Sequence, residues 1–251
     1  MSIPVTIVIP TYNAASTLVD ALASIREHAP GAEVIVVDGD SEDDTAAVIK
    51  DNADVVTRFV SEPDSGVYDA MNKGLALATR TWFYDMGADD ELLPGFASAV
   101  AQLDDPDTFY YGRIWLRHHD HAAGGPYTDL GLMTMWPHHQ ALIAPTAALR
   151  ELGGFDLRYH VAADWALQIR AWDGGAHWHY HGEVICKFNE LGWGSESGPD
   201  PAFRHDRLLL FYRHLSRRAL VVFLATTLRY RWLRALASLR RLVPARRRGR
   251  G

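Results

Sequence analysis

Two adjacent carboxylates follow an apolar run near residue 90. The stretch Thr81–Leu93 reads TWFYDMGADDELL, so Asp89 and Asp90 come shortly after aromatic residues suited to a buried strand. In an open parallel sheet, ligands bind outside the carboxyl ends of the strands. Carboxylates at that place suit a hard divalent cation whose remaining ligands are substrate phosphates. The alternative is that Asp89 or Asp90 caps a helix that begins near Pro94.

Polar residues also follow the other apolar runs of the first half. They are Thr11 and Tyr12 after residues 5–9, Asp38 after residues 34–37, and Asp64 after residues 55–60. Each one alone is compatible with a turn or a helix cap. Right-handed crossovers bring the carboxyl ends of successive parallel strands to one edge, so we expect these residues to meet Asp89 and Asp90 there. Because acid-rich strand ends repel anions, a phosphate ligand at this edge needs a metal ion.

Helical segments separate these apolar runs. Leucine and isoleucine recur at helical spacing from about Ser16, and further helices are expected over residues 45–49 and 67–79. Strands and helices therefore alternate, and the strands are almost continuously apolar. This pattern predicts an α/β fold with a mostly parallel central sheet that helices cover on both faces.

One carboxylate of the second half lies at the start of an expected helix. The segment AADWALQIR, from Ala162 to Arg170, has Asp164 in its first turn. The helix dipole favours an ionised carboxylate at this position, and a general base needs that state. The alternative is that Asp164 is an ordinary N-cap.

Two groups of histidines have ligand types that zinc accepts. They are His118, His119 and His121 with Asp120, and the alternating His177, His179 and His181. Neighbouring residues on an extended segment point in opposite directions, which favours a solvated loop for the first group. Alternate residues share one face of a strand, so the second group is geometrically better for a metal, but we favour a polar sheet face there as well.

The composition is ordinary for a globular protein of 251 residues. That length is enough for one large α/β domain or two small ones. Cys186 is the only cysteine, which excludes an intrachain disulfide and is compatible with a reducing compartment. The chain passes from Met1 directly into an apolar strand, without the pattern of a signal peptide. We therefore expect a cytoplasmic protein.

The net charge of −6 hides a strong asymmetry. Residues 204–251 carry fourteen arginines against the single acid Asp206, a charge of +13, whereas residues 1–203 carry −19. In the tail, Leu228 and Trp232 begin an apolar stripe at helical spacing that arginines flank, which suits an interfacial helix on anionic lipid. The alternative is that this stripe packs on the domain. The uncharged span 219–228 is too short to cross a bilayer, and the acidic body argues against nucleic-acid binding.

Several motifs in order resemble the family 2 glycosyltransferases of GT-A fold. They are VTIVIPTYNAASTLVDALASI, VIVVDGDSEDDT, SEPDSGVYDAMNKGLALAT, GADD, HHQALI, GGFD and AADWALQIR. More narrowly they resemble bacterial members that extend extracellular polysaccharides, such as colanic acid and amylovoran, or mycobacterial phenolic glycolipids. The resemblance covers about Val5 to Gly194. It implies a Rossmann-like GT-A domain over residues 1–203, with a nucleotide-binding half (1–95) and an acceptor half (96–203), before a basic amphipathic helical tail (204–251).

The resemblance also implies where a nucleotide-sugar donor binds. Thr11 and Tyr12 would frame the nucleoside, Tyr12 by stacking, and Asp38 would accept a hydrogen bond from the base. Asp64 would lie near the nucleotide sugar. Lys73, together with its neighbour Asn72, would approach the diphosphate from the following helix, although a solvated helix surface is an equal alternative for both.

For the reaction itself the resemblance implies an inverting transfer. Asp90 would bind Mg²⁺ or Mn²⁺, Asp89 would contact the ribose, and Asp164 would be the general base. The chain reads GADD rather than a literal Asp-x-Asp, which leaves the division between Asp89 and Asp90 open. It also has Ala166 where many relatives have a second acid, so Asp164 would act alone.

The expected partners are the donor and a hydroxyl of a glycan or lipid-linked acceptor. This places the protein in cell-surface polysaccharide or glycolipid biosynthesis. We expect it on the cytoplasmic face of the inner membrane if the tail binds lipid. The alternatives are a sugar-nucleotide-binding protein without transfer activity and a nucleotidyltransferase, which would release pyrophosphate instead of a nucleoside diphosphate.

Overall fold

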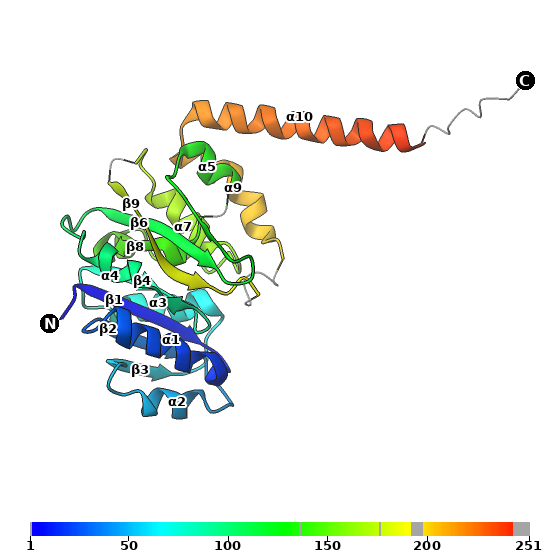
Figure 1. Ribbon diagram of the computed structural model, residues 1–251. Coiled ribbons are helices and arrows are strands. Elements are labelled where there is room, and N and C mark those ends of the chain that lie inside the picture. The colour runs from blue at the N-terminus through cyan, green and yellow to red at the C-terminus, as the bar shows by residue number, and fades with distance from the viewer. Residues whose placement is uncertain (1, 136, 176, 192–197, 243–251) are drawn as a thin grey trace, which may run out of the picture.

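The first half of the chain forms four parallel strands in a computed structural model, which describes residues 2–135, 137–175, 177–191 and 198–242. The strands are β1 (Val5–Thr11), β2 (Glu33–Asp38), β3 (Arg58–Ser61) and β4 (Trp82–Asp85), and they pair in the order β3-β2-β1-β4. Helices α1 (Ala15–His28), α2 (Thr45–Asp51) and α3 (Val67–Leu77) connect them. The predicted alternation of strands and helices is confirmed (Figure 1).

The second half extends the same sheet but mixes strand directions. Its strands are β5 (Glu91–Leu92), β6 (Phe109–Leu116), β7 (His121–Ala123), β8 (Leu142–Pro145) and β9 (Trp178–Phe188). The order continues β4-β8-β6-β9-β5, with β8 antiparallel to both of its neighbours and β6 parallel to β9. The α/β prediction therefore holds, whereas parallel pairing dominates only in the first half, where crossover helices join the strands.

Short helices accompany these later strands. They are α4 (Gly95–Val100), α5 (Asp129–Thr134), the 3₁₀ turn η1 (His139–Ala141), α6 (Thr146–Glu151) and α7 (Ala163–Ala171). η1 runs directly into β8, and α7 packs on the sheet face that also carries α3 and α6. The turn η1 carries His139, and α7 carries Asp164.

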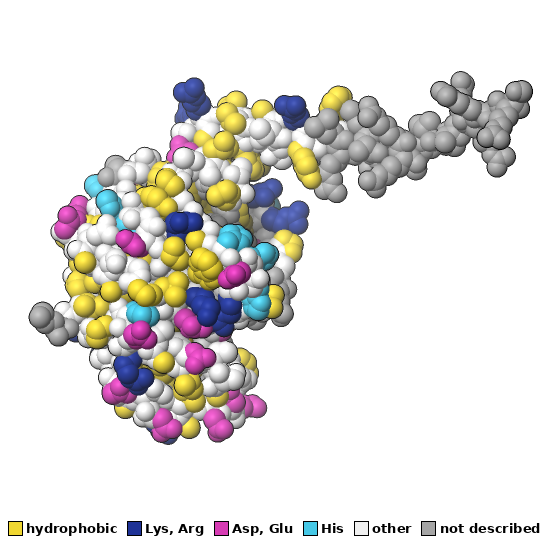
Figure 2. Space-filling model, in the orientation of Figure 1, with side chains coloured by type: hydrophobic (Ala, Val, Ile, Leu, Met, Phe, Trp, Pro, Cys, Tyr) yellow, Lys and Arg dark blue, Asp and Glu magenta, His cyan; other side chains and the backbone are white. Residues whose placement is uncertain are grey.

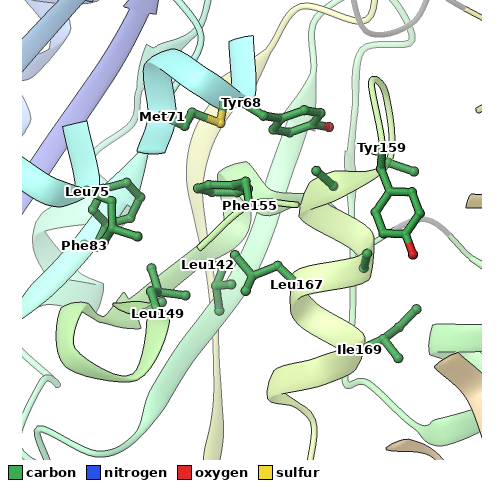
Figure 3. Close-up of a cluster of buried hydrophobic side chains, with 14 of the residues drawn as sticks. Tyr68, Met71, Leu75, Phe83, Leu142, Leu149, Phe155, Tyr159, Leu167 and Ile169 are labelled. Atoms are coloured by element: carbon green, nitrogen blue, oxygen red, sulfur yellow. The ribbon is translucent and has the colours of Figure 1, made fainter. Parts of the chain in front are cut away.

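Two hydrophobic layers cover the two faces of the sheet. Because successive residues of a strand point to opposite faces, Val8 packs in one layer while Ile7 and Ile9 pack in the other. The first layer joins α3, α6 and α7 through Leu75, Leu149 and other apolar residues, which converge in Figure 3. These two layers fix the sheet edge at which β1, β2 and β4 end.

The C-terminal part begins as an integral part of the domain. The side chain of Asp200 caps α9 (Pro201–His214) by accepting from the amide of Phe203 at 3.0 Å. Phe203 and Phe211, together with Phe223 of α10 (Arg217–Leu242), are buried in the same layer as α7. The predicted boundary at residue 203 therefore falls inside a helix that packs on the body.

Beyond this packed region α10 leads away from the body (Figure 1). Within the described residues, no helix combines the length and apolar character needed to cross a membrane. The part of the predicted stripe that lies beyond residue 242 is outside the described residues.

Candidate active site

Asp38 lies at the centre of the sheet edge where the first strands end. The register of β1 and β2 places Thr11 directly opposite Asp38, and the Thr11 hydroxyl donates to Asp38 Oδ1 at 3.1 Å. The hydroxyl of Ser61 donates to Oδ2 at 2.8 Å, and both the amide and the hydroxyl of Ser41 donate to the same carboxylate. The structure thus brings Thr11 and Asp38 together as the sequence predicts.

These donors set the ionisation of Asp38. Burial alone would raise its pKa, but the hydrogen bonds from Ser41, Ser61 and Thr11 outweigh burial and hold the pKa below its usual value. Four donors match the acceptor capacity of one carboxylate. In this state Asp38 orders the loop after β2, and its contact with a nucleotide base stays a prediction.

Tyr12 follows Thr11 at the same edge and exposes two thirds of its side-chain surface, a relative exposure of 66%. The next residue, Asn13, adopts a positive φ of 49° in the turn that leads to α1. The backbone amide of Glu42 donates to Asn13 Oδ1 at 3.0 Å, and this hydrogen bond connects the turn to the loop after β2. An exposed aromatic face beside Asp38 is a suitable stacking surface for a planar ring.

Asp64 approaches the loop after β2 closely. A Cβ atom at Gly39 would lie 2.8 Å from Asp64 Oδ2, which shows how near the Asp64 carboxylate lies to the backbone of this loop. The amide of Gly66 donates to Asp64 Oδ1 at 2.8 Å and holds the carboxylate in place. The predicted convergence of Asp38 and Asp64 is therefore present, although they lie on different loops.

Lys73 fastens the turn that carries Asp64. Its Nζ donates to the carbonyl of Pro63 at 2.9 Å and pairs with Glu62 at 2.9 Å. Its neighbour Asn72 exchanges hydrogen bonds with the backbone of Phe155 at 2.8 and 2.9 Å, which joins α3 to the segment before α7. Both residues thus hold loops in this state, and their approach to a diphosphate stays a prediction.

Asp89 and Asp90 converge over one glycine after β4. A Cβ atom at Gly87 would lie 2.8 Å from Asp89 Oδ1 and 2.9 Å from Asp90 Oδ2. Asp90 is buried, and its two oxygens accept from the amides of Gly87 at 3.1 Å and Asn189 at 2.9 Å. Asp89 is half-buried and accepts from the Asn189 side chain at 2.7 Å. Asp89 is thus the more exposed residue of the pair, and the assignment of metal binding to Asp90 stays a prediction.

The pKa of Asp90 depends on its burial and on the charges around it. Burial, and then the neighbouring charge of Asp89, raise the pKa of Asp90 to about 7, while the amide of Asn189 opposes this rise. A cation bound nearby would favour the ionised form. The available donors are carboxylate oxygens, which suit Mg²⁺ or Mn²⁺ when phosphates and water complete the shell.

No group of three or more His, Cys, Asp or Glu side chains in the described parts of the chain is arranged to hold a metal ion. His118, His119 and Asp120 lie in the turn after β6, as the loop interpretation predicts, whereas His121 begins β7. His179 and His181 lie on β9, which agrees with the sheet-face interpretation. A cation at Asp89 and Asp90 would therefore depend on a bound phosphate for part of its ligand shell.

Asp164 lies in the first turn of α7, as predicted, and is buried with 3% exposure. The hydroxyl of Tyr68 lies 2.8 Å from Asp164 Oδ1 and also contacts the carbonyl of Val161. Tyr68 projects from α3, as Figure 3 shows. A residue of the nucleotide-binding half thus reaches the carboxylate of the second half. This hydrogen bond is one of several that connect the two predicted halves of the site.

The family model for glycosyl transferase family 2 matches residues 6–135, which is more than half of the chain. The chain belongs to this family. It is 34% identical over 209 residues to a PGL/p-HBAD biosynthesis glycosyltransferase of Mycobacterium tuberculosis (strain H37Rv), and the match covers 78% of this chain and 81% of that protein. The protein is therefore a glycosyltransferase, as its motifs predict.

Solved glycosyltransferases share the fold. TarS of S. aureus (residues 1–349, in complex with UDP-GlcNAc) matches with a TM-score of 0.67 and 18% identity over 84% of this chain and 65% of that chain. The mannosyltransferase PcManGT of Pyrobaculum calidifontis, in complex with GDP-Man and Mn²⁺, matches with a TM-score of 0.61 and 20% identity over 95% of this chain and 81% of its own. These likenesses confirm the predicted fold class.

The glycosyltransferase also holds an ion pair that the sequence did not reveal. Nδ1 of His139, in η1, contacts the carboxylate of Asp85 at the end of β4. Burial alone would lower the pKa of His139, but the charge and hydrogen bond of Asp85, with the charges of Asp164 and Asp90, raise it to about 9. The pair therefore stabilises the fold fully below about pH 6.5, and this contribution is lost as the pH rises through about 9.

Proposed function

We propose that this glycosyltransferase moves a sugar from a nucleoside diphosphate sugar to a hydroxyl of a lipid-linked acceptor, with inversion at the anomeric carbon. The observation that carries the proposal is the parallel pairing of β1, β2, β3 and β4, because Asp38, Asp64 and the pair Asp89 and Asp90 all follow strands that end at the same sheet edge. Asp164 belongs to the same site because it contacts α3 of the nucleotide half. The relatives named for PGL/p-HBAD biosynthesis support a glycolipid acceptor, and the neighbours solved with UDP-GlcNAc and with GDP-Man support the donor class.

In the proposed reaction Asp164 is the general base. It takes the proton of the acceptor hydroxyl while that oxygen forms a bond to the anomeric carbon and the bond to the nucleoside diphosphate breaks. Asp89 and Asp90 would hold Mg²⁺ or Mn²⁺, which when bound offsets the charge of the leaving diphosphate. Attack from the face opposite the leaving group gives inversion in one displacement, so no covalent intermediate is needed.

Tyr68 has a defined place in this reaction. Its hydroxyl contacts the carboxylate that must accept the proton, and Asp164 is closed to solvent in this state. Hydrogen bonds of catalytic groups in unliganded enzymes commonly differ from those in the reactive complex. We propose that the acceptor hydroxyl replaces the Tyr68 hydroxyl at Asp164, while Tyr68 keeps its contact with the Val161 carbonyl.

A thermal-shift panel of UDP-, GDP- and dTDP-sugars tests the donor site. With the correct donor at a hundredfold excess over its Kd, binding to the folded state adds about 2.7 kcal/mol. For a domain of this size that is a rise in Tm of roughly 5 to 10 °C. We expect this rise with Mn²⁺ and a much smaller one with EDTA. If none of the donors changes the Tm with either addition, the proposed donor site is wrong.

We further propose that α10 binds an anionic membrane surface. Val221, Leu228 and Trp232 share one stripe of the helix and are each more than 60% exposed, whereas Phe223 on the other side is buried against the domain. The stripe therefore lies opposite the buried side of α10, and Arg229 next to it in the sequence is also exposed. Figure 2 shows hydrophobic and basic side chains on the surface of the described part of this helix. Burial of large apolar side chains and attraction of arginines to anionic lipid act together on such a face.

The double substitution of Leu228 and Trp232 by glutamate is expected to weaken binding to anionic vesicles by about 10²-fold or more. Burial of each side chain contributes about 1.5 to 3 kcal/mol, and 1.4 kcal/mol is tenfold in affinity. Vesicle sedimentation measures the effect, and added salt should weaken binding of the unmodified protein. This double variant is preferable to truncation before Arg204, because truncation would remove buried Phe211 and Phe223.

The matched control is the double substitution of Thr226 and Tyr230 by glutamate. These exposed residues have the same spacing but lie about half a turn away from the stripe. If both double variants lose binding equally, added negative charge alone explains the loss and the apolar stripe has no specific role. If neither variant loses binding, α10 does not bind the membrane.

A further inference from the structure

A buried polar cluster lies beside Asp164, and the transfer reaction described above makes no use of it. Asp85, His139 and Gln168 line the same small cavity as Asp164, with a volume of about 20 Å³. The remaining wall is apolar and is formed by Leu142, Ala144, Leu149, Phe155 and Leu167. Polar groups in such surroundings interact strongly, because little water is present to screen them.

His139 is the positive member of this cluster. The groups that face it are Asp85 from β4, Asp164 from α7, Asp90 from the loop after β4 and the adjacent His138. Burial, and then the charge of His139, lower the pKa of His138 to about 4, so His138 is neutral near pH 7. The pKa of about 9 keeps His139 protonated there. His139 is thus an imidazolium cation that interacts with the charges of Asp85, Asp90 and Asp164.

Gln168 supplies an independent observation. It follows Asp164 by four residues on α7, so the two side chains lie on one face of the helix. Its Oε1 is buried and has no hydrogen-bond partner among the described residues, while its Nε2 lies 3.5 Å from the carbonyl of Pro137. A buried acceptor without a donor is costly, and His139 is a donor that lines the same cavity.

We propose that His139 is a positioning residue for the transfer reaction: Asp85 holds it as an imidazolium beside the cavity that Asp164 and Gln168 also line, and its charge stabilises the carboxylate form of Asp164. The inference rests on the proposed role of Asp164 as general base. No proton leaves His139 in the reaction, because Asp164 alone receives the proton of the acceptor hydroxyl. Burial otherwise favours the neutral acid, which cannot act as a base.

The substitution His139→Gln tests the proposal through the pH profile of kcat. Glutamine retains a hydrogen-bond donor and removes the charge. We expect a ten- to hundredfold lower kcat near pH 7 with an unchanged KM for the donor, and an acid limb moved to higher pH. The decline of the unmodified enzyme as the pH rises through about 9 should be absent from the variant.

Two further variants distinguish this role from a structural one. Asp85→Asn removes the partner that holds the proton on His139, so the alkaline decline should move to lower pH. His139→Lys keeps a cation and should restore part of the kcat and the original acid limb. A purely structural role predicts one uniformly lower profile for all three variants, and that result would overturn the proposal even if His139→Gln folds poorly.

The donor thermal shift separates the failure of this inference from that of the proposed function. If the unmodified protein binds no donor and transfers no sugar, the proposed function is wrong. If it transfers sugar and His139→Gln leaves both kcat and the acid limb unchanged, only the role of His139 is wrong.

Discussion

Replacing Asp164 with asparagine is expected to abolish sugar transfer and to leave donor binding intact. Asparagine has nearly the same shape and still accepts the hydrogen bond of Tyr68, so the packing of α7 against α3 is kept. It cannot take a proton from the acceptor hydroxyl. General-base catalysis contributes about 10² to 10⁴ in rate, so kcat should fall by at least that range. The measurement is release of the nucleoside diphosphate with acceptor present.

The matched control is Asp156→Asn, which neutralises a carboxylate of the turn before α7. Asp156 is bound by the exposed Arg158, and nothing in the geometry gives it a place in the reaction. It should retain most of the activity. A transfer rate of Asp164→Asn within tenfold of the unmodified enzyme would contradict the assignment of the base, and an unchanged donor-induced Tm shift would show that the variant is folded.

The sequence was most informative where structure is local or repeated. In β1, β2 and β4 a mainly apolar run leads to a polar residue at the end of the strand, and the parallel register of β1 and β2 places Thr11 opposite Asp38. The third strand, β3, covers only the end of the predicted run 55–60 and is partly exposed. The first turn of α7 was recognised from its own pattern in the same way. Positions along one edge of a parallel sheet follow from topology, which a short sequence pattern determines.

Contacts between distant segments could not be inferred in this way. The hydrogen bond between Tyr68 and Asp164 joins residues 96 positions apart. The ion pair of Asp85 and His139 joins two segments that no pattern in the sequence placed in contact. Packing of the tail on the domain stayed an open alternative for a related reason, since an arginine-rich composition hides a single buried side such as that of Phe211. Such contacts depend on how the layers pack, and no periodicity of the sequence encodes them.

The division of labour between Asp89 and Asp90 is the sharpest example. Family resemblance assigned the metal to Asp90, but Asn189, 99 positions away, donates its backbone amide to Asp90 and its side chain to Asp89. That contact leaves Asp90 buried and Asp89 partly exposed. Because the two carboxylates differ in burial and in hydrogen bonding, substitution of Asp89 and substitution of Asp90 are expected to have different effects.

Asp89→Asn is expected to remove the part of donor binding and turnover that depends on a divalent metal. A metal ion contributes several kcal/mol to the stabilisation of a leaving phosphate, so kcat/KM should fall by about 10² to 10³. The rise in Tm caused by donor with Mn²⁺ should shrink to the value seen with EDTA. Asp107→Asn, an exposed carboxylate of the loop before β6, is the matched control and should retain both effects.

Asp90→Asn is expected to behave differently, because its carboxylate is occupied by two backbone amides. Loss of charge-assisted hydrogen bonds to a buried group costs about 1.5 to 3 kcal/mol, so the unfolding midpoint in urea should fall. The response of donor binding to Mn²⁺ should survive at least in part, since Asp89 is the more exposed residue of the pair. If the metal dependence instead disappears with Asp90→Asn and persists with Asp89→Asn, the assignment made from the motif is correct and donor binding must rearrange the loop around Gly87. If both variants keep the metal dependence, the pair does not hold the metal and the donor must be bound through other residues of this edge.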